Sequence, residues 1–270
     1  MYKRQVYASL TGYGLEGPDR GRPGYDVGAF WARSGLAGAI VPPGELPPGV
    51  RSGMGDHVTG LALCAGIVAK LLERERTGVG GLVATSLLRA GMYCAGWDLG
   101  IVLRFGRIQR TRPRTANPAP LVNCYAAGDG KGFWLLGLEQ DRHWPGLVSA
   151  LERPALRDDP RFASAAERAG HAEELIAVLD EVFATRSREE WTEAFDLHDV
   201  WWAPINSLQD VIADPQAQAS GGFVDMPLVD GVDPYRAVAS PVDFAGYVQR
   251  PGPVPALGQH TDEVLASLLP

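Results

Sequence analysis

One carboxylate in this chain stands in a setting that suits covalent chemistry. Asp56 follows Gly53 and Gly55, precedes Gly60, and opens an apolar helical stretch. Glycines let a ligand approach the backbone closely, and N–H groups at a helix start stabilise negative charge. Position alone favours a plainer role, because aspartate is among the best N-capping residues. We therefore consider two roles for Asp56, helix cap and nucleophile, which can coexist.

A nucleophilic aspartate must be ionised yet poorly solvated, which N–H donors and burial achieve together. Its attack on a thioester forms a mixed anhydride and expels a thiolate. Backbone N–H groups stabilise the oxygen charge that develops in this step. Gly53, Gly55 and Gly60 would form the loop around that oxygen, so the sequence predicts acyl transfer at Asp56.

Other catalytic motifs are absent from the sequence. The five histidines form no HExxH or i, i+4 pair, so we predict no metal site. Neither a GxSxG elbow nor a GxxxxGK[ST] phosphate loop occurs. Gly12-x-Gly14-x-x-Gly17 matches a dinucleotide loop, but residues 18–23 read as an irregular loop where that motif needs a helix. We therefore predict no nicotinamide site.

Five arginines gather in a short stretch that reads as a linker. They are Arg104, Arg107, Arg110, Arg112 and Arg114. Such a cluster could bind phosphate, or it could be a solvated connector, and the sequence favours the connector. Trp97, Phe105 and Trp134 suit an apolar acyl group, but core packing explains them equally well.

Composition narrows the class of protein. The 270 residues are 46% hydrophobic and 21% charged, which is ordinary for a globular protein. A formal charge of −7 does not favour nucleic acid or an anionic membrane. Cys64, Cys94 and Cys124 form no CxxC pair, which indicates a reducing compartment. No signal core and no run of about 18 apolar residues is evident, so we expect a cytoplasmic protein.

The first third of the chain has the order of a parallel α/β sheet. We expect a strand over residues 6–10, a helix over 25–39 that loosens at its glycines, and a strand over 82–85. Between them, residues 61–72 are apolar on nearly all faces, which predicts a buried helix that ends at Gly78.

The rest of the chain reads as mixed α and β. Expected strands are 133–138, 223–226 and 237–239, and expected helices are 142–151, 172–185, 207–213 and 262–269. A further helix starts at Ser187, which forms a capping box with Glu190. Residues 201–204 read as a turn.

Several short motifs, in series, resemble the family III CoA-transferases, which include formyl-CoA transferase, carnitine CoA-transferase and α-methylacyl-CoA racemase. No one match is decisive, but their shared order from about residue 6 to the end is specific. The matching stretches are Ser9 to Gly14, Gly17-Pro18, Arg22 to Asp26, Gly55 to Gly60, Glu75 to Gly80, Asp158 to Phe162, Ala203 to Ser207, Asp214-Pro215 and Leu257 to Leu265.

The resemblance implies roles for named residues. Asp56 matches the family's catalytic aspartate, which carries the acyl group as an anhydride with CoA bound. Arg22, Pro23, Gly24 and Tyr25 match a segment that contacts CoA. The partners implied are an acyl-CoA and a carboxylic acid acceptor, with the CoA thioester as substrate and no further cofactor. Two chains are expected to interlock as a homodimer.

The resemblance also implies a fold. We expect an α/β protein with an incomplete Rossmann-like large lobe over residues 1–95, a linker over 96–119, and a smaller α+β lobe over 120–228. Residues 229–270 would return to the large lobe. The family's opening strands and much of its CoA pocket have no counterpart here, so we expect the chain to be part of a longer enzyme.

Two alternatives to CoA transfer stay open. Racemase relatives have a His-Asp pair where this chain has Tyr25-Asp26, which favours a transferase over a racemase or isomerase. No glycine-rich loop like that of formyl-CoA transferase lies near residues 115–118, so its substrate preference does not carry over. The other alternative is a non-catalytic module that binds CoA or supports assembly.

Overall fold

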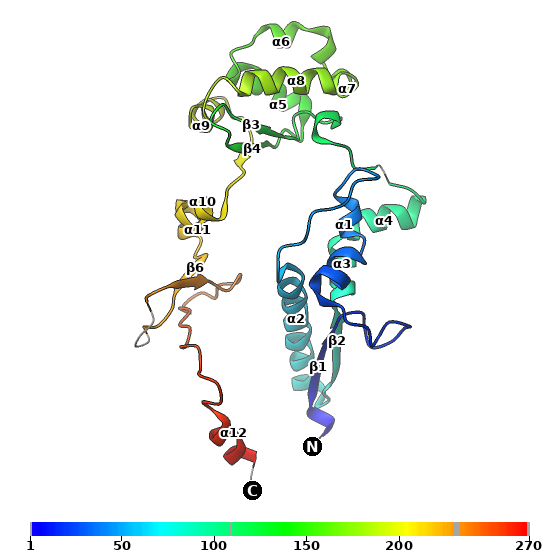
Figure 1. Ribbon diagram of the computed structural model, residues 1–270, viewed down its shortest axis with the longest axis vertical. Helices are drawn as coiled ribbons and strands as arrows, with labels where there is room; N and C mark the ends of the chain where they lie inside the picture. The colour runs from blue at the N-terminus through cyan, green and yellow to red at the C-terminus, as the bar shows by residue number, and fades with distance from the viewer. Residues whose placement is uncertain (1, 109, 229–232, 269–270) are drawn as a thin grey trace.

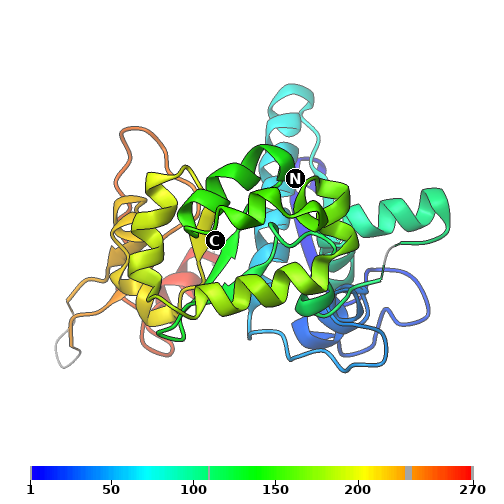
Figure 2. The same cartoon turned by 90° about the horizontal axis from the view of Figure 1, so that it is seen from above.

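The computed structural model describes residues 2–108, 110–228 and 233–268. The chain forms an arch: an N-terminal arm (residues 2–105) and a C-terminal arm (residues 207–268) extend from an upper lobe (residues 114–206), and the two ends of the chain lie at the far ends of the arms (Figure 1). Seen from above, the helices of the upper lobe extend across from one arm to the other (Figure 2). Residues 106–113 join the N-terminal arm to the upper lobe.

The N-terminal arm is built on one parallel strand pair. Its elements in order are η1 (Tyr2–Arg4), β1 (Val6–Thr11), the π-helix η2 (Tyr25–Ala32), α1 (Leu36–Ala39), α2 (Met54–Thr77), β2 (Gly81–Ser86), α3 (Leu87–Cys94) and α4 (Gly96–Phe105). β1 and β2 run parallel, with Val6 opposite Gly81, and α2 lies in the crossover that such a pair requires. The predicted strands and the break in the helix over residues 25–39 are confirmed.

The prediction of a buried helix before Gly78 is wrong, although Gly78 does end α2 with a left-handed φ of 75°. Only Gly55 and Thr59 of α2 are buried, while Leu61, Val68 and Leu72 are exposed. Apolar residues become buried only where another surface covers them, and η2, α3, β1 and β2 cover one side of α2. By length and composition, α2 is also the one helix in the described residues that could cross a membrane, a weak signal because core helices meet the same test.

The upper lobe is a three-stranded antiparallel sheet covered by helices. The strands β3 (Cys124–Ala126), β4 (Gly132–Leu135) and β5 (Trp202–Pro204) follow that order in the sheet. The helices are η3 (Arg114–Ala116), α5 (Gln140–Ala150), α6 (Ala155–Asp158), η4 (Pro160–Phe162), α7 (Ala165–Gly170), α8 (Ala172–Phe183) and α9 (Arg188–Leu197). The predicted strand over 133–138 and helices over 142–151 and 172–185 are confirmed, with small shifts at their ends.

Aromatic side chains fill the core of the upper lobe. Phe183 contacts four other rings, and its ring centre lies 4.9 Å from that of Phe133 and 5.3 Å from that of Trp191. Edge-to-face packing of this kind stabilises a core beyond the area it buries. Buried Arg168 lies against this core, where it donates to the carbonyl of Phe162 and pairs with Asp141.

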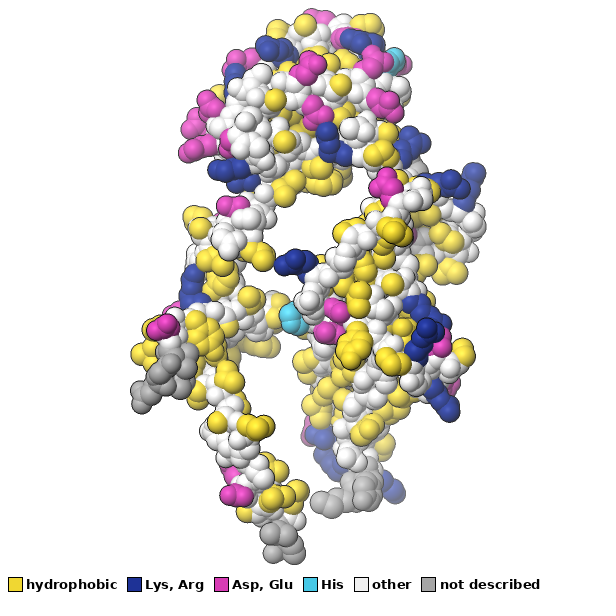
Figure 3. Space-filling model, in the orientation of Figure 1, with side chains coloured by type: hydrophobic (Ala, Val, Ile, Leu, Met, Phe, Trp, Pro, Cys, Tyr) yellow, Lys and Arg dark blue, Asp and Glu magenta, His cyan; other side chains and the backbone are white. Residues whose placement is uncertain are grey.

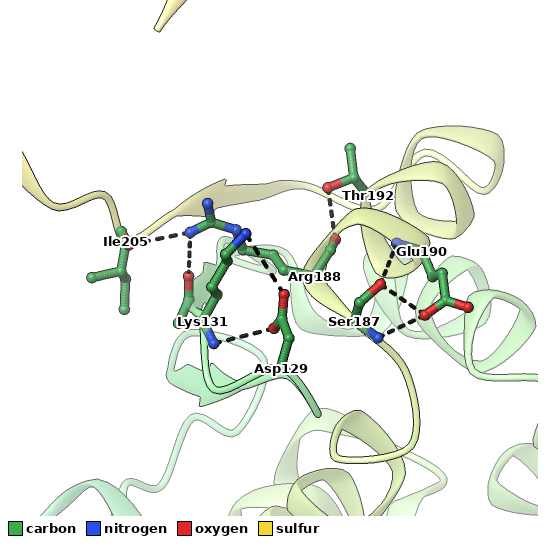
Figure 4. A network of polar contacts seen from close by, with 8 residues as sticks. Asp129, Lys131, Ser187, Arg188, Glu190, Thr192 and Ile205 are labelled. Atoms are coloured by element: carbon green, nitrogen blue, oxygen red, sulfur yellow. Dashed lines mark hydrogen bonds and ion pairs between the residues drawn. The ribbon is translucent and has the colours of Figure 1, made fainter. Parts of the chain in front are cut away.

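Residues 201–204 do not form the predicted turn. Trp202–Pro204 is β5, which pairs with β4 along its whole length. Arg188 holds the end of this pair, because its guanidinium donates to the carbonyls of Gly132 and Ile205, both at 3.2 Å (Figure 4). The sequence-based expectation failed because the pairing depends on residues far away in the chain.

The predicted capping box at the start of α9 is confirmed. The Ser187 hydroxyl accepts from the Glu190 N–H at 3.3 Å, and the Glu190 carboxylate accepts from the Ser187 N–H at 2.8 Å (Figure 4).

The C-terminal arm is extended and exposed. It consists of α10 (Leu208–Ala213), α11 (Pro215–Ala219), the antiparallel pair β6 (Phe223–Asp225) and β7 (Arg236–Val238), and α12 (Thr261–Leu268). None of its described residues is buried. The predicted elements here are confirmed, although residue 269 of the last helix and residues 229–232, where the return segment was expected to start, lie outside the described residues.

Candidate functional site

Asp56 does not cap its helix. Gly53 is the N-cap of α2, with a left-handed φ of 80° and no side chain to offer, and Asp56 lies in the first turn that follows it. Asp56 is exposed and accepts no hydrogen bond from any described residue, so the poor solvation expected of a nucleophilic carboxylate is not found here. The capping role that position alone favoured is therefore wrong, and the Asp56 carboxylate has no hydrogen-bond partner among the described residues.

Asp26 takes part in the start of α2 instead. The Gly53 N–H donates to the Asp26 carboxylate at 2.8 Å. Asp26 lies in the first turn of η2, directly after residues 22–25. This one hydrogen bond therefore brings the predicted CoA-contacting segment next to the helix that carries Asp56. Sequence reasoning noted Asp26 as part of a motif but gave no partner for it.

Free N–H groups lie beside Asp56. In the described residues, the backbone N–H groups of Gly55 and Asp56 have no acceptor, whereas that of His57 bonds to the carbonyl of Gly53 at 2.9 Å. Unpaired N–H groups in the first turn of a helix attract negative charge. The N–H of exposed Asp56 is a suitable donor to an oxygen that becomes charged there, whereas Gly55 is buried against Phe30.

The three predicted loop glycines lie in different surroundings. A Cβ on Gly55 would lie 2.5 Å from Cγ of Phe30, so Gly55 allows η2 and α2 to pack closely. Gly53 supplies the left-handed turn into the helix. Only Gly60 faces open space, with nothing within 4 Å of its Cβ position. Close packing therefore accounts for one of the three glycines that had been interpreted as clearance for a ligand.

Residues 22–25 form a constrained and exposed turn. Tyr25 has a φ of 48°, a backbone conformation that residues other than glycine rarely adopt. Its side chain is 78% exposed. A Cβ on Gly24 would lie 2.8 Å from the Cα of Gly12, so the two backbones cross closely here. Arg22, with neighbouring Pro23, is exposed and reaches Asp19 at 3.7 Å. An exposed tyrosine and arginine held in place this way can contact a ligand.

The loop between β1 and η2 is irregular and contains no helix in the described residues. Gly17 has a φ of 96° and no helix opens there, so the irregular loop expected over residues 18–23 is confirmed. The loop is fastened by Arg33, whose guanidinium pairs with Asp19. That hydrogen bond lowers the pKa of Asp19 below its usual value.

The site lies on an open face of the molecule. α2 lies on the side of the N-terminal arm that faces the C-terminal arm (Figure 1), and open space separates the arms below the upper lobe (Figure 3). Among the described residues, no group of three or more His, Cys, Asp or Glu side chains could hold a metal ion. The arrangement offers a carboxylate, free N–H donors and an exposed Tyr-Arg turn, which suit reaction with a carbonyl group.

Comparison with known proteins identifies the family. The profile of CoA-transferase family III matches residues 1–261. The chain is 30% identical over 272 residues to (R)-2-hydroxy-4-methylpentanoate CoA-transferase of Clostridioides difficile, covering 99% of this chain and 66% of that protein. It is also 30% identical over 224 residues to 2-methylfumaryl-CoA isomerase of Chloroflexus aurantiacus, covering 79% of this chain and 54% of that protein.

A solved structure shows the same fold. A CAIB/BAIF family protein from Brucella suis superimposes with a TM-score of 0.84 at 25% identity, over 99% of this chain and 68% of that one. The chain thus spans less than two thirds of each of these two curated relatives and about two thirds of this structure. The mixed α/β fold and the resemblance noted in the sequence are both confirmed. The chain belongs to CoA-transferase family III.

Proposed function

We propose that this protein transfers CoA from an acyl-CoA thioester to a free carboxylic acid, with Asp56 as the nucleophile. The Asp56 carboxylate attacks the thioester carbonyl carbon, the C–S bond breaks, and the CoA thiolate leaves with the electron pair. Asp56 then carries the acyl group as a mixed anhydride. The thiolate then attacks the Asp56 carbonyl carbon, so that Asp56 becomes a thioester of CoA and the donor acid leaves as a carboxylate. The acceptor carboxylate attacks this thioester, and the same steps in reverse release the new acyl-CoA and free Asp56.

One observation supports this role most directly. Asp26, not Asp56, accepts from the Gly53 N–H, so the Asp56 carboxylate has no structural duty at the helix start. The unpaired N–H group of Asp56 would stabilise the oxyanion that forms on the attacked carbonyl. Residues 22–25 lie beside them and would contact CoA.

Chemical trapping tests the proposal. The protein is incubated with an acyl-CoA and then with hydroxylamine, which converts an acylated aspartate into a hydroxamate that peptide mass spectrometry locates. We expect the hydroxamate at Asp56 and its loss, together with transferase activity, in Asp56→Asn. Asp262→Asn is the matched control, because Asp262 is also an exposed first-turn aspartate of a helix. Transfer that continues while Asp56 stays unmodified would contradict the mechanism.

Isomerisation on the same scaffold is the second candidate, because one relative is named 2-methylfumaryl-CoA isomerase. A racemase of an acyl-CoA, or an isomerase that moves a proton, exchanges the proton on the carbon next to the thioester. Incubation with an acyl-CoA in deuterated water therefore separates the two reactions, since a pure transferase incorporates no deuterium at that carbon. If Asp56→Ala leaves CoA binding and every measurable activity unchanged, the third candidate, a non-catalytic CoA-binding module, is favoured instead.

We also propose that the protein acts in the cytoplasm as an interlocked homodimer. The exposed apolar side chains of α2 and the unburied C-terminal arm offer surfaces that a second chain would cover. Sedimentation equilibrium measures the mass directly. A monomer at micromolar concentration would count against this assembly.

A further inference from the structure

A second candidate site lies where the N-terminal arm meets the upper lobe. A cavity of about 990 Å³ opens between α4, the segment after it, and strands β3 and β4. Its character comes from four arginines and two tryptophans: Arg107, Arg110, Arg112, Arg114, Trp97 and Trp134. Figure 3 shows basic side chains gathered at this joint. Neither Asp56 nor residues 22–25 line the cavity, so it is separate from the start of α2.

The arginines that line the cavity outnumber the one carboxylate in its lining, Asp98. Arg114 forms two hydrogen bonds to Asp180, at 3.1 and 2.7 Å, which raise the pKa of its guanidinium. Arg107, Arg110 and Arg112 form no ion pair with any residue that the structure describes. In a chain of charge −7, such a concentration of free guanidinium groups attracts an anion with several charges.

The walls of the cavity are fastened on both sides. The Arg114 guanidinium donates to the carbonyl of Cys124 at 3.2 Å, and the Asn123 amide donates to the carbonyl of Arg114 at 3.1 Å. On the other side, the Thr111 hydroxyl donates to the carbonyl of Ala39 in the N-terminal arm. A loose solvated connector, which the sequence favoured, would lack these contacts. The segment is a fixed wall that presents its arginines to the cavity.

An exposed aromatic ring distinguishes the ligand. Trp97 lies in the first turn of α4 and is 82% exposed, and Ile101 follows it along the cavity wall. An indole face beside guanidinium groups suits a planar base whose phosphates reach the arginines, because bases stack on aromatic rings and phosphates pair with arginine. A dicarboxylic acid would use the charges but leave the ring without a partner. The volume is also within the range of small-molecule sites.

We infer that this cavity binds a nucleotide with two or more phosphate groups. Its base stacks on Trp97, and its phosphates pair with Arg107, Arg110 and Arg112. Two sources share this chemistry: a free nucleotide such as ADP, and the nucleotide end of CoA. The choice of CoA as a source rests on the proposed function, whereas the nucleotide site itself does not.

Binding measurements on the full chain test the inference. Isothermal titration with ADP, CoA, pyrophosphate and adenosine is expected to show binding of the phosphate-bearing ligands and weak or no binding of adenosine. Arg107→Gln with Arg112→Gln is expected to weaken ADP binding by about a hundredfold, roughly tenfold for each charge-assisted contact. Arg153→Gln is the matched control, because Arg153 is exposed, lies outside the cavity and should leave affinity unchanged.

A second variant isolates the stacking contact. Trp97→Leu should weaken ADP by about tenfold and leave pyrophosphate unaffected, since only the base touches the indole. Its circular dichroism should match the wild type, because the side chain is largely exposed. Equal ADP affinity in the double arginine variant, or no binding of any phosphate ligand to the wild type, would overturn the site.

Two further comparisons distinguish CoA from a free nucleotide and test this inference separately from the proposed acyl transfer. CoA binding that is much tighter than ADP binding, and weakened by the double arginine variant, identifies CoA as the ligand; the reverse preference identifies a free nucleotide. Asp56→Asn should leave ADP affinity unchanged while it abolishes the hydroxamate. Failure of the cavity inference would therefore leave the Asp56 adduct intact, and failure of the acyl-transfer proposal would leave ADP binding intact.

Discussion

The upper lobe and the N-terminal arm differ in how much of their apolar surface they bury. Eighteen described residues form the core of the upper lobe, and its aromatic rings contact one another. The corresponding cluster in the arm has four residues, Ala29, Phe30, Leu87 and Ala90, beside a long apolar helix that is mostly exposed. The upper lobe thus has the larger hydrophobic core, while the proposed acyl transfer takes place in the N-terminal arm.

This difference shows that apolar composition and burial are separate properties of a helix. Apolar composition shows that a helix prefers to be covered, but only the fold shows whether a covering surface is available. A well-packed lobe can hold its shape while an arm with a small core adapts to whatever binds its exposed face. The following predictions test that contrast, from the largest expected effect to the smallest.

Truncation of the aromatic core should have the largest effect. Phe183→Ala removes a fully buried ring that contacts four others, so it should lower the free energy of unfolding by about 3–5 kcal/mol. Leu72→Ala in α2 is the matched large-to-small control and should change it little, because Leu72 is 56% exposed. Urea unfolding followed by circular dichroism measures both. Similar losses in the two variants would mean that α2 is covered in solution.

Two glycines of α2 sharpen the comparison within the arm. Gly55→Ala places a methyl group against Phe30 and should destabilise the arm by about 1–3 kcal/mol. Gly60→Ala meets open space, so it should stabilise the helix by about 1 kcal/mol through its better helix propensity. Thermal unfolding of the pair gives the two signs. A loss at Gly60 as large as that at Gly55 would show that an unseen surface contacts α2.

A smaller effect is expected at the start of α9. Ser187→Ala removes the side-chain half of the capping box and should lower stability by about 1 kcal/mol. Ser187→Asp preserves a capping acceptor and should recover part of the loss. Differential scanning calorimetry resolves the shift, and equal melting temperatures for wild type and Ser187→Ala would contradict the assignment of the box.

The smallest expected effect is the pH dependence of the same box. Hydrogen bonds from the Ser187 hydroxyl and N–H lower the pKa of Glu190. Because the folded-state pKa is depressed, this stabilisation is complete above the unfolded glutamate value of about 4.3 and is lost as the pH falls through the folded value. The difference in melting temperature between wild type and Glu190→Gln should therefore shrink from pH 7 to pH 3. A constant difference would contradict this linkage.

Local patterns predicted much of the fold. The strand–helix–strand order of the first third located β1 and β2, a serine three residues ahead of a glutamate located α9, and Gly78 marked the end of α2. These features depend on neighbours a few residues away. β5 and the exposure of α2 were missed because both depend on distant partners: β4 in one case, and a covering surface in the other.

The candidate site was predictable in its residues but not in its contacts. Family motifs singled out Asp56 and residues 22–25, and their proximity emerges only through the Asp26–Gly53 hydrogen bond. The arginine stretch was visible as a cluster, yet its sequence favoured a solvated connector. Hydrogen bonds from this stretch to the carbonyls of Ala39 and Cys124, which are distant in the sequence, hold it in place as one wall of the cavity.

The Asp26–Gly53 hydrogen bond has a consequence for interpreting mutational scans. Loss of Asp26 would release Gly53, the N-cap of α2, and displace the first turn, so an activity screen would score it as severely as loss of Asp56. The two defects differ in kind, since one misplaces a reactive group and the other deletes it. Slow accumulation of covalent adduct in an Asp26→Ala protein, against none in Asp56→Asn, would tell them apart.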